Sequence, residues 1–236
     1  MRTETSVIVC VIVVISVAIS ACSVGNLASQ GPSSQLSASP TPQPTVNSSP
    51  SVNSPIRAVD FANFAYPANP AFSYGRKSFK LQHGRYDGDK THDPLLLAFV
   101  GYGDVKSDGL EEAMVIIEVS VRGYAIPHIV YVYAMESGTP KLLWAFETGD
   151  RGDGGLRQAY AENGRLVIEL YGKDKLIGKN LYESNPFALE GVCCPKLFTR
   201  ARYRWQGDHF QQEGKEEVLP NPEGHGSLVM TRYHPS

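Results

Sequence analysis

Apolar side chains recur at every second position in parts of this chain, and this period constrains the fold most strongly. Val115, Ile117, Val119 and Val121 share one face of an extended segment. Side chains alternate between the two faces of a strand, so the period predicts a half-buried β-strand. No amphipathic helical pattern of about ten residues or more is evident in residues 57–236. The sequence therefore favours antiparallel strands over parallel βαβ units.

The segment 129–135 is apolar on both faces and lies between Pro127 and a turn at 136–140. An apolar run bounded in this way predicts a central strand of a sheet. Alternating apolar residues follow directly after the turn, which predicts the next strand. These are Leu142, Trp144 and Phe146.

A hairpin is predicted by Asn163-Gly164, because this dipeptide tolerates the positive φ angles of a type I′ turn. Alternating apolar residues follow it in 166–170. A last pair of strands is predicted at 198–205 and 209–212. We therefore expect a mainly β domain, an antiparallel meander that forms a sandwich or an open barrel, with few or no long helices.

The N-terminal sequence indicates an export signal. Residues 7–19 form an apolar run interrupted only by Ser16. A helix of this length spans about 20 Å, which is short of the roughly 30 Å core of a bilayer. The run therefore predicts the apolar core of a signal peptide over residues 1–21.

Ile19-Ser20-Ala21-Cys22 resembles the lipobox of bacterial lipoproteins. The resemblance implies cleavage before Cys22, lipidation of that cysteine and permanent attachment to a membrane. Ser23 after the cysteine resembles the pattern exported to an outer membrane. An ordinary secretory signal cut near Ala21 and an uncleaved anchor are the alternatives. We expect an exported, lipid-anchored protein at the cell membrane or the outer membrane.

The segment 22–56 reads as a disordered Ser/Pro-rich spacer. From Ser23 onward it has no charged residue, and ten Ser and six Pro fill almost half of its positions. Such a segment buries too little apolar surface to offset the entropy of ordering. We place a single β-rich domain at 57–236, with an irregular tail after about residue 215.

Four motifs in the domain resemble a group of uncharacterised secreted or lipid-anchored bacterial proteins. The motifs are F-x-N-F-x-Y-P at 61–67, Y-G-D at 102–104, D-G-x-E-E at 108–112 and C-C-P at 193–195. The resemblance covers roughly residues 58–213. It implies a shared β-rich fold and brings no known activity.

Two acidic loops are candidate cation sites. Asp104, Asp108 and Glu112 lie in a segment that resembles the calcium loop D-x-D-x-D-G. Lys106 departs from that pattern, since it occupies the place of the second carboxylate and its ammonium repels a cation. The alternative is a turn in which Asp104 and Asp108 accept hydrogen bonds from backbone amides.

The second acidic loop contains Asp150 and Asp153 in a glycine-rich stretch. If both loops lie at the same end of the sheet, the second loop can bind one cation together with the first. Otherwise the second loop is a turn. We assign no metal and no cofactor to the chain.

Arg200, Arg202 and Arg204 alternate, so in a strand all three leave the same face, opposite Ala201 and Tyr203. Guanidinium groups in a row bind carboxylates or phosphates in bidentate fashion. The row therefore predicts either an anion-binding face or a solvated strand that resists edge pairing.

Cys193 and Cys194 are the two thiols left after signal cleavage and lipidation. An exported protein meets an oxidising compartment. A strained vicinal disulfide between them is our first expectation, with free thiols, bonds between two chains or a shared metal as alternatives.

The chain carries no signature of a known enzyme class. It has no G-x-S-x-G, H-E-x-x-H or Walker sequence, and its six histidines lack close ligand spacing. A formal charge of −2 gives no field that would gather nucleic acid. We expect a non-catalytic envelope module that binds a glycan, a peptide or an envelope protein. A hydrolase with a dispersed active site and a purely structural protein are the alternatives.

Overall fold

Two antiparallel sheets make up most of the computed structural model, which describes residues 54–68, 77–90, 93–120, 127–150, 152–179 and 194–229. All of these residues belong to one unit, Thr45–Ser236. In this described part of the chain, no helix has the length and apolarity needed to cross a membrane. The signal segment, Cys22 and most of the spacer lie outside it.

The first sheet has five strands in the order β3-β4-β5-β6-β7, and each neighbouring pair is antiparallel. Its strands are β3 (Arg85–Tyr86), β4 (Leu95–Gly103), β5 (Glu112–Val119), β6 (His128–Glu136) and β7 (Thr139–Glu147).

The second sheet has four strands in the order β11-β10-β9-β8, again antiparallel throughout. Its strands are β8 (Leu156–Glu162), β9 (Arg165–Tyr171), β10 (Leu197–Trp205) and β11 (Phe210–Pro220). Each strand pairs with the next one along the chain in both sheets. The predicted mainly β, meandering architecture is confirmed.

Strands β5 and β6 are buried on both faces, because β-branched and aromatic side chains point in both directions from them. Ile116 and Ile117 are both fully buried, as are Val130 and Tyr131. Side chains of this kind fit a pleated, enclosed surface. These strands therefore need a packing layer on each side of the sheet.

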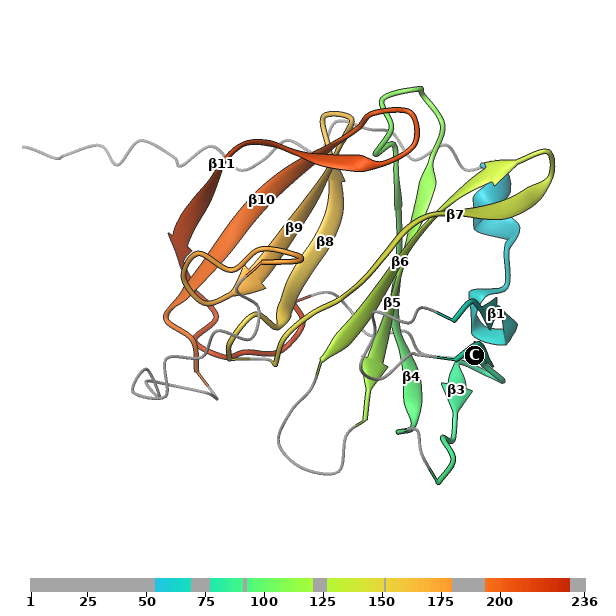
Figure 1. The fold of residues 1–236 in the computed structure, drawn as a ribbon, viewed down its shortest axis with the longest axis horizontal. Helices are drawn as coiled ribbons and strands as arrows, with labels where there is room; N and C mark the ends of the chain where they lie inside the picture. The colour runs from blue at the N-terminus through green and yellow to red at the C-terminus, as the bar shows by residue number, and fades with distance from the viewer. Residues whose placement is uncertain are drawn as a thin grey trace, which may run out of the picture. The chain divides into compact units, whose positions relative to one another are not determined.

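The N-terminal part of the domain covers one face of the five-stranded sheet. Four short elements form this layer: η1 (Pro55–Ala58), η2 (Phe61–Asn63), β1 (Ala65–Tyr66) and β2 (Phe79–Lys80). Phe61, Phe64 and Tyr66 pack on Tyr131 and Tyr133 of β6, with ring centroids 5.0–5.7 Å apart. Figure 1 shows this layer in cyan on one side of the green sheet.

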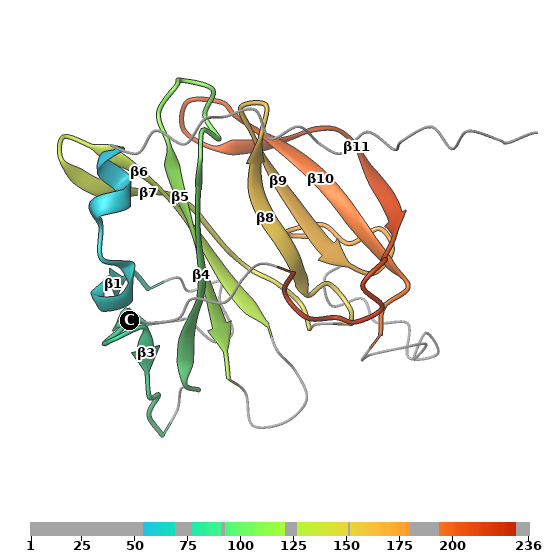
Figure 2. The same cartoon turned by 180° about the vertical axis from the view of Figure 1, so that it is seen from behind.

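The four-stranded sheet covers the opposite face. Met114, Ile116 and Val132 of the central sheet pack in one cluster with Leu166 and Ile168 of β9. The view from behind shows the same order of layers, with β4 and β5 between the N-terminal elements and β8 (Figure 2). The chain thus forms a sandwich with an additional short layer on one side.

Two hairpin turns have the backbone angles that their sequences favour. Asn163 and Gly164 have φ angles of 52° and 71° and join the pair Glu162↔Arg165. Ser137 and Gly138 connect β6 to β7 with φ angles of 48° and 80°. Positive φ at both central residues matches the twist of the strands, so the predicted Asn-Gly hairpin is confirmed.

The structure differs from the predicted elements in three places. Ile56 is fully buried in the N-terminal layer, so the folded domain begins before residue 57. Strand β11 continues to Pro220, because a bulge near Gly214 interrupts the alternation that would have revealed its second half. The sequence analysis also missed β4, whose Leu95–Gly103 stretch alternates poorly.

The two sheets approach each other most closely where β4 ends beside β8. A Cβ atom at Gly103 would lie 2.4 Å from the Cβ of Ala161, which is far too close. We expect Gly103→Ala to lower the free energy of unfolding by about 1–3 kcal/mol through overpacking. Adding Ala161→Gly to the same chain should recover most of the lost free energy of unfolding, as measured by urea denaturation. Wild-type stability of the single variant Gly103→Ala would contradict the close approach.

Candidate functional site

The first acidic loop, between β4 and β5, is built by its own carboxylates. Asp104 accepts backbone hydrogen bonds from Ser107 at 2.6 Å, Asp108 at 3.2 Å and Gly109 at 2.9 Å. Asp108 accepts one from Leu110 at 3.0 Å. These are the amide contacts that the turn alternative predicts, so both aspartates have a structural role.

A cluster of three carboxylates nonetheless forms in this loop. Asp104, Asp108 and Glu112 each offer an oxygen, and these oxygens lie within 4.8 Å of one another. The ammonium of Lys106 lies 2.8 Å from Asp108 Oδ2 and 3.5 Å from Glu112 Oε1. Lys106 therefore supplies one positive charge inside the cluster, where a metal ion would otherwise lie, and offsets part of its negative charge.

Burial sets the protonation of this cluster. Glu112 is almost completely buried, and burial raises the pKa of its carboxyl to about 7. Its Oε2 accepts a hydrogen bond from the amide of Val105 at 3.0 Å, which partly opposes that rise. Burial also disfavours the charge of Lys106, but the carboxylates of Asp108 and Glu112 outweigh it and raise the pKa of the ammonium. The pair carries a proton that titrates near neutral pH.

The second acidic loop lies at the other end of β8. Ser107 of the first loop packs against Gly164, beyond the end of β8, whereas Asp153 precedes the start of that strand. The seven residues of β8 span roughly 20 Å. The condition for a shared cation, that both loops lie at the same end of the sheet, is therefore not met, and the second loop has the alternative role of a turn.

The second loop forms a turn closed by a lysine. Asp153 donates its amide to the carbonyl of Asp150 at 2.8 Å. The Asp153 carboxylate lies 2.7 Å from the ammonium of Lys175, a buried residue of the β9–β10 connection. This loop, like the first, meets its acidic charge with a lysine of the same chain.

The predicted arginine row lies on one face of β10. Ala201 and Tyr203 point into the core, while Arg200, Arg202 and Arg204 leave the opposite face. This arrangement confirms the alternation that the sequence predicts. It places the guanidinium groups on the outer surface of the four-stranded sheet.

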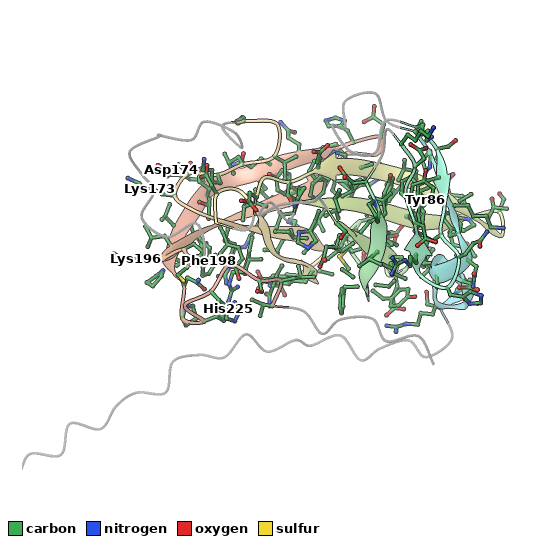
Figure 3. All side chains as sticks on the ribbon, turned by 90° about the horizontal axis from the view of Figure 1, so that it is seen from below. Tyr86, Lys173, Asp174, Lys196, Phe198 and His225 are labelled. Carbon is green, nitrogen blue, oxygen red and sulfur yellow. The ribbon has the colours of Figure 1, made fainter. Side chains whose placement is uncertain are left out.

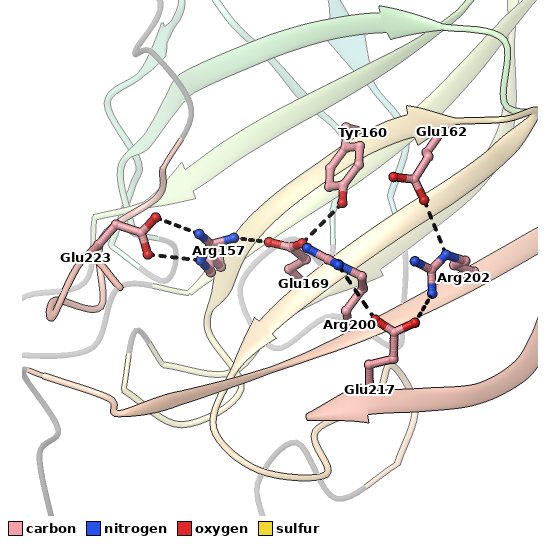
Figure 4. Close-up of polar contacts among 8 residues, drawn as sticks. All are labelled: Arg157, Tyr160, Glu162, Glu169, Arg200, Arg202, Glu217 and Glu223. Atoms are coloured by element: carbon pink, nitrogen blue, oxygen red, sulfur yellow. Dashed lines mark hydrogen bonds and ion pairs between the residues drawn. The ribbon is translucent and has the colours of Figure 1, made fainter. Parts of the chain in front are cut away.

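A buried glutamate organises this outer surface (Figure 4). Glu169 of β9 is fully buried and binds Arg157 of β8 and Arg200 of β10, with 2.7 Å between Arg200 Nε and Glu169 Oε1. The hydroxyl of Tyr160 donates to the same carboxylate at 3.2 Å. Glu223, which follows β11, binds Arg157 at 2.6 Å.

The other arginines of the row also have carboxylate partners. Arg202 binds Glu217 at 2.5 Å and Glu162 at 3.3 Å. Arg204 binds Glu213 at 2.8 Å. Each guanidinium of the row is therefore compensated by the same sheet. This charge balance weakens the interpretation as an anion-binding face, which stays a prediction.

Several charged side chains and one aromatic ring lie at one end of the four-stranded sheet. Figure 3 places Lys173, Asp174, Lys196, Phe198 and His225 there, and Tyr86 at the other end of the ribbon. Cys194 is disulfide-bonded. The remaining cysteines, Cys193 included, lie outside the described residues, so the vicinal bond stays a prediction. Asn221 fixes this end by donating to the carbonyl of Pro195 at 2.7 Å.

Residues of the motifs at 61–67 and 102–112 have structural roles. Phe61, Phe64 and Tyr66 build the N-terminal aromatic layer. Arg57 lies 4.6 Å above the ring of Tyr102 and pairs with Glu111 through both carboxylate oxygens. These contacts explain the motif residues by folding, and they do not indicate a reaction.

An aromatic cluster that the sequence analysis missed lies between β7 and the β10–β11 hairpin. Trp144 packs on Phe146, Tyr203 and Phe210, with ring centroids 4.6, 5.2 and 5.6 Å apart. Trp205 packs on Phe210 at 4.9 Å. Phe146 and Tyr203 are buried, whereas the other three rings are only half-buried. The chain's two tryptophans thus meet at a partly open edge of the sandwich.

Two described histidines, His209 and His225, have partners that do not form a recognisable catalytic group. His209 contacts the carboxylate of Asp208 at 2.6 Å, and both side chains are exposed. His225 accepts a hydrogen bond from the amide of Ser227 at 3.3 Å. Neither contact supplies a base for a serine or cysteine nucleophile. The hydrolase alternative stays untested, since His92 and His234 lie outside the described residues.

Comparison with protein-family models, with curated proteins and with solved structures finds no match. No relative therefore contributes a residue role. The function has to be argued from the contacts of this chain alone.

Removing Lys106 tests whether its ammonium takes the place of a cation. We expect Lys106→Ala to lower the free energy of unfolding by about 1–3 kcal/mol, because buried carboxylate charge is left without a partner. Millimolar calcium should then raise the melting temperature of the variant and leave the wild type unchanged. Lys173→Ala, at an exposed lysine, is the matched control. A calcium-induced rise in the wild type would contradict this account.

The buried carboxyl of Glu112 predicts a pH dependence of stability. Its folded pKa of about 7 lies above the ordinary 4.5, so the folded chain retains a proton that the unfolded chain has lost. Stability should therefore fall as pH rises from 4.5 to 7, by up to about 3 kcal/mol, and level off above pH 7.

Urea unfolding at pH 5, 6, 7 and 8 measures this fall. Glu112→Gln should lack it, since the amide does not titrate. Glu111→Gln should keep it, because the arginine partner lowers the pKa of Glu111 and moves its titration below the window. The same slope in wild type and Glu112→Gln would assign the pH dependence to other groups.

Proposed function

We propose that this protein is an exported, lipid-anchored and non-catalytic binding module. The order of its segments carries the proposal. An apolar run ends at Ile19-Ser20-Ala21-Cys22, an uncharged Ser/Pro-rich segment follows, and a β domain comes last. Acyl chains on Cys22 would hold the protein at the membrane, and a coil of some 30 residues would place the domain roughly 30 Å away.

The domain contacts support binding more than chemistry. Its carboxylate clusters are engaged by Lys106, Lys175 and the arginines of the outer sheet face. Ion pairs of this kind hold the loops and strands of the fold together. Among the described residues, the half-buried rings of Trp144, Trp205 and Phe210 form an aromatic surface that a ligand can reach. Aromatic side chains concentrate binding energy at such surfaces.

Lipidation is the part of the proposal that a single substitution tests. Cells supplied with an alkyne fatty acid should label the wild-type chain and leave Cys22→Ala unlabelled. The variant should leave the membrane fraction, because one signal segment without acyl chains does not anchor the domain. Cys10→Ala is the matched control and should label normally. Equal labelling of Cys22→Ala and wild type would overturn the anchor.

A further inference from the structure

We propose that Trp144, Trp205 and Phe210 form a stacking site for a neutral glycan chain, and we call these three residues the edge cluster. The inference rests on the proposed function, since it names the ligand class of the binding module. The edge cluster joins an edge strand of one sheet, β7, to the hairpin of the other, β10–β11. Both elements can be followed in Figure 1.

The two tryptophans have different positions in the edge cluster. Trp144 contacts three rings, two of which are buried, so it forms the inner part of the site, next to the core. Among the described residues, the ring pairs of Trp205 comprise Phe210 alone. Trp205 therefore retains ring surface for a ligand, and Phe210 supports it from the opposite strand.

The hairpin holds the stacking rings in place. Trp205 and Phe210 are a cross-strand pair, and the amide of Gln206 donates to the carbonyl of His209 at 2.9 Å to close the turn. Gly207 has a φ angle of 99°, which suits glycine and fixes the path of the chain. A surface built before the ligand arrives costs less conformational entropy on binding.

Charge around the edge cluster favours a neutral ligand. Arg204 is paired with Glu213 at 2.8 Å, and His209 contacts Asp208 at 2.6 Å. Arg165 also binds Glu213, so the two arginines balance the carboxylates of Glu213 and Asp208 and leave little net charge to attract a polyanion or a polycation. The exposed side chain of Gln206 adds an amide that both donates and accepts hydrogen bonds.

A sugar ring matches this combination of aromatic faces and neutral polar groups. The flat side of a pyranose presents polarised C–H bonds, which are attracted to the negative face of an aromatic ring. Its rim carries hydroxyls that hydrogen-bond to amides and carboxylates. Ligand sites commonly combine apolar rings with a few orienting polar groups in this way. An anionic polymer would need unpaired cations, and an extended peptide would pair with the backbone of an edge strand such as β7 and leave the ring faces unused.

Intrinsic fluorescence tests the site directly, because the chain's two tryptophans both belong to the edge cluster. The full-length mature protein, extracted in detergent, is titrated with cellohexaose and with chitohexaose. We expect a saturable change in emission with at least one of them. Trp205→Ala should weaken binding at least tenfold, as measured by titration calorimetry. Its unfolding midpoint should be unchanged. Trp205→Phe should retain most of the affinity.

Leu110→Ala is the matched control, since Leu110 is an exposed apolar residue in another loop. It should bind as the wild type does. Three results would overturn the inference: no binding of either hexasaccharide, equal affinity of Trp205→Ala and wild type, or binding of heparin or of an unfolded peptide at Trp205 in preference to both sugars. If fatty-acid labelling of Cys22 persists in such a case, the anchored module stands without a glycan ligand.

Discussion

The burial of β5 and β6 on both faces is the constraint on which the rest of the structure depends. Each buried valine or isoleucine contributes about 1.5–3 kcal/mol only when both sides of the sheet are kept from water. The four-stranded sheet covers one side. The other side is covered by an aromatic layer that starts at Ile56, immediately after the spacer. The first residues of the domain are therefore as necessary to the fold as its strands.

The positions of the charged groups follow from the same burial of the sheet faces. The ends and outer faces of the sheets bring carboxylates together, and each group meets a cation from its own chain. Lys106 lies on the loop before β5, Lys175 closes the turn before β8, and Arg157 and Arg200 enclose Glu169. Removing one partner of such a buried group costs far more than replacing both. These clusters account for part of the stability of the described fold.

The sequence predicts local features well. The double-sided apolar run at 129–135, the Asn-Gly hairpin and the shared face of the arginine row all depend on neighbours along one strand. Ile56 and the second half of β11 were missed, because a proline-rich context and a bulge hide them from periodicity. The partners of the arginines come from three strands, β8, β9 and β11, and from the segment after β11, and no local pattern pairs Arg157 with Glu223.

The edge cluster is the clearest case of a feature set by tertiary contacts. Trp144 and Phe210 are far apart in the sequence and meet only when the two sheets stack. The sequence contains one indication of this cluster. Both tryptophans, Trp144 and Trp205, occur in strand segments with alternating apolar residues, at positions that face inward. That pattern indicates burial, and the half-open position of Trp205 appears only in the structure.

The central claim is that the polar clusters are closed by the fold while the aromatic edge remains open to a ligand. Amide and indole NMR of the ¹⁵N-labelled full chain, with and without a neutral hexasaccharide, tests it most directly. The account predicts that the indole N–H signal of Trp205 shifts most, with smaller shifts in β7 and the β10–β11 turn. The claim would be contradicted if the indole signals did not shift and the shifts were confined to the outer face around Arg200 and Glu169.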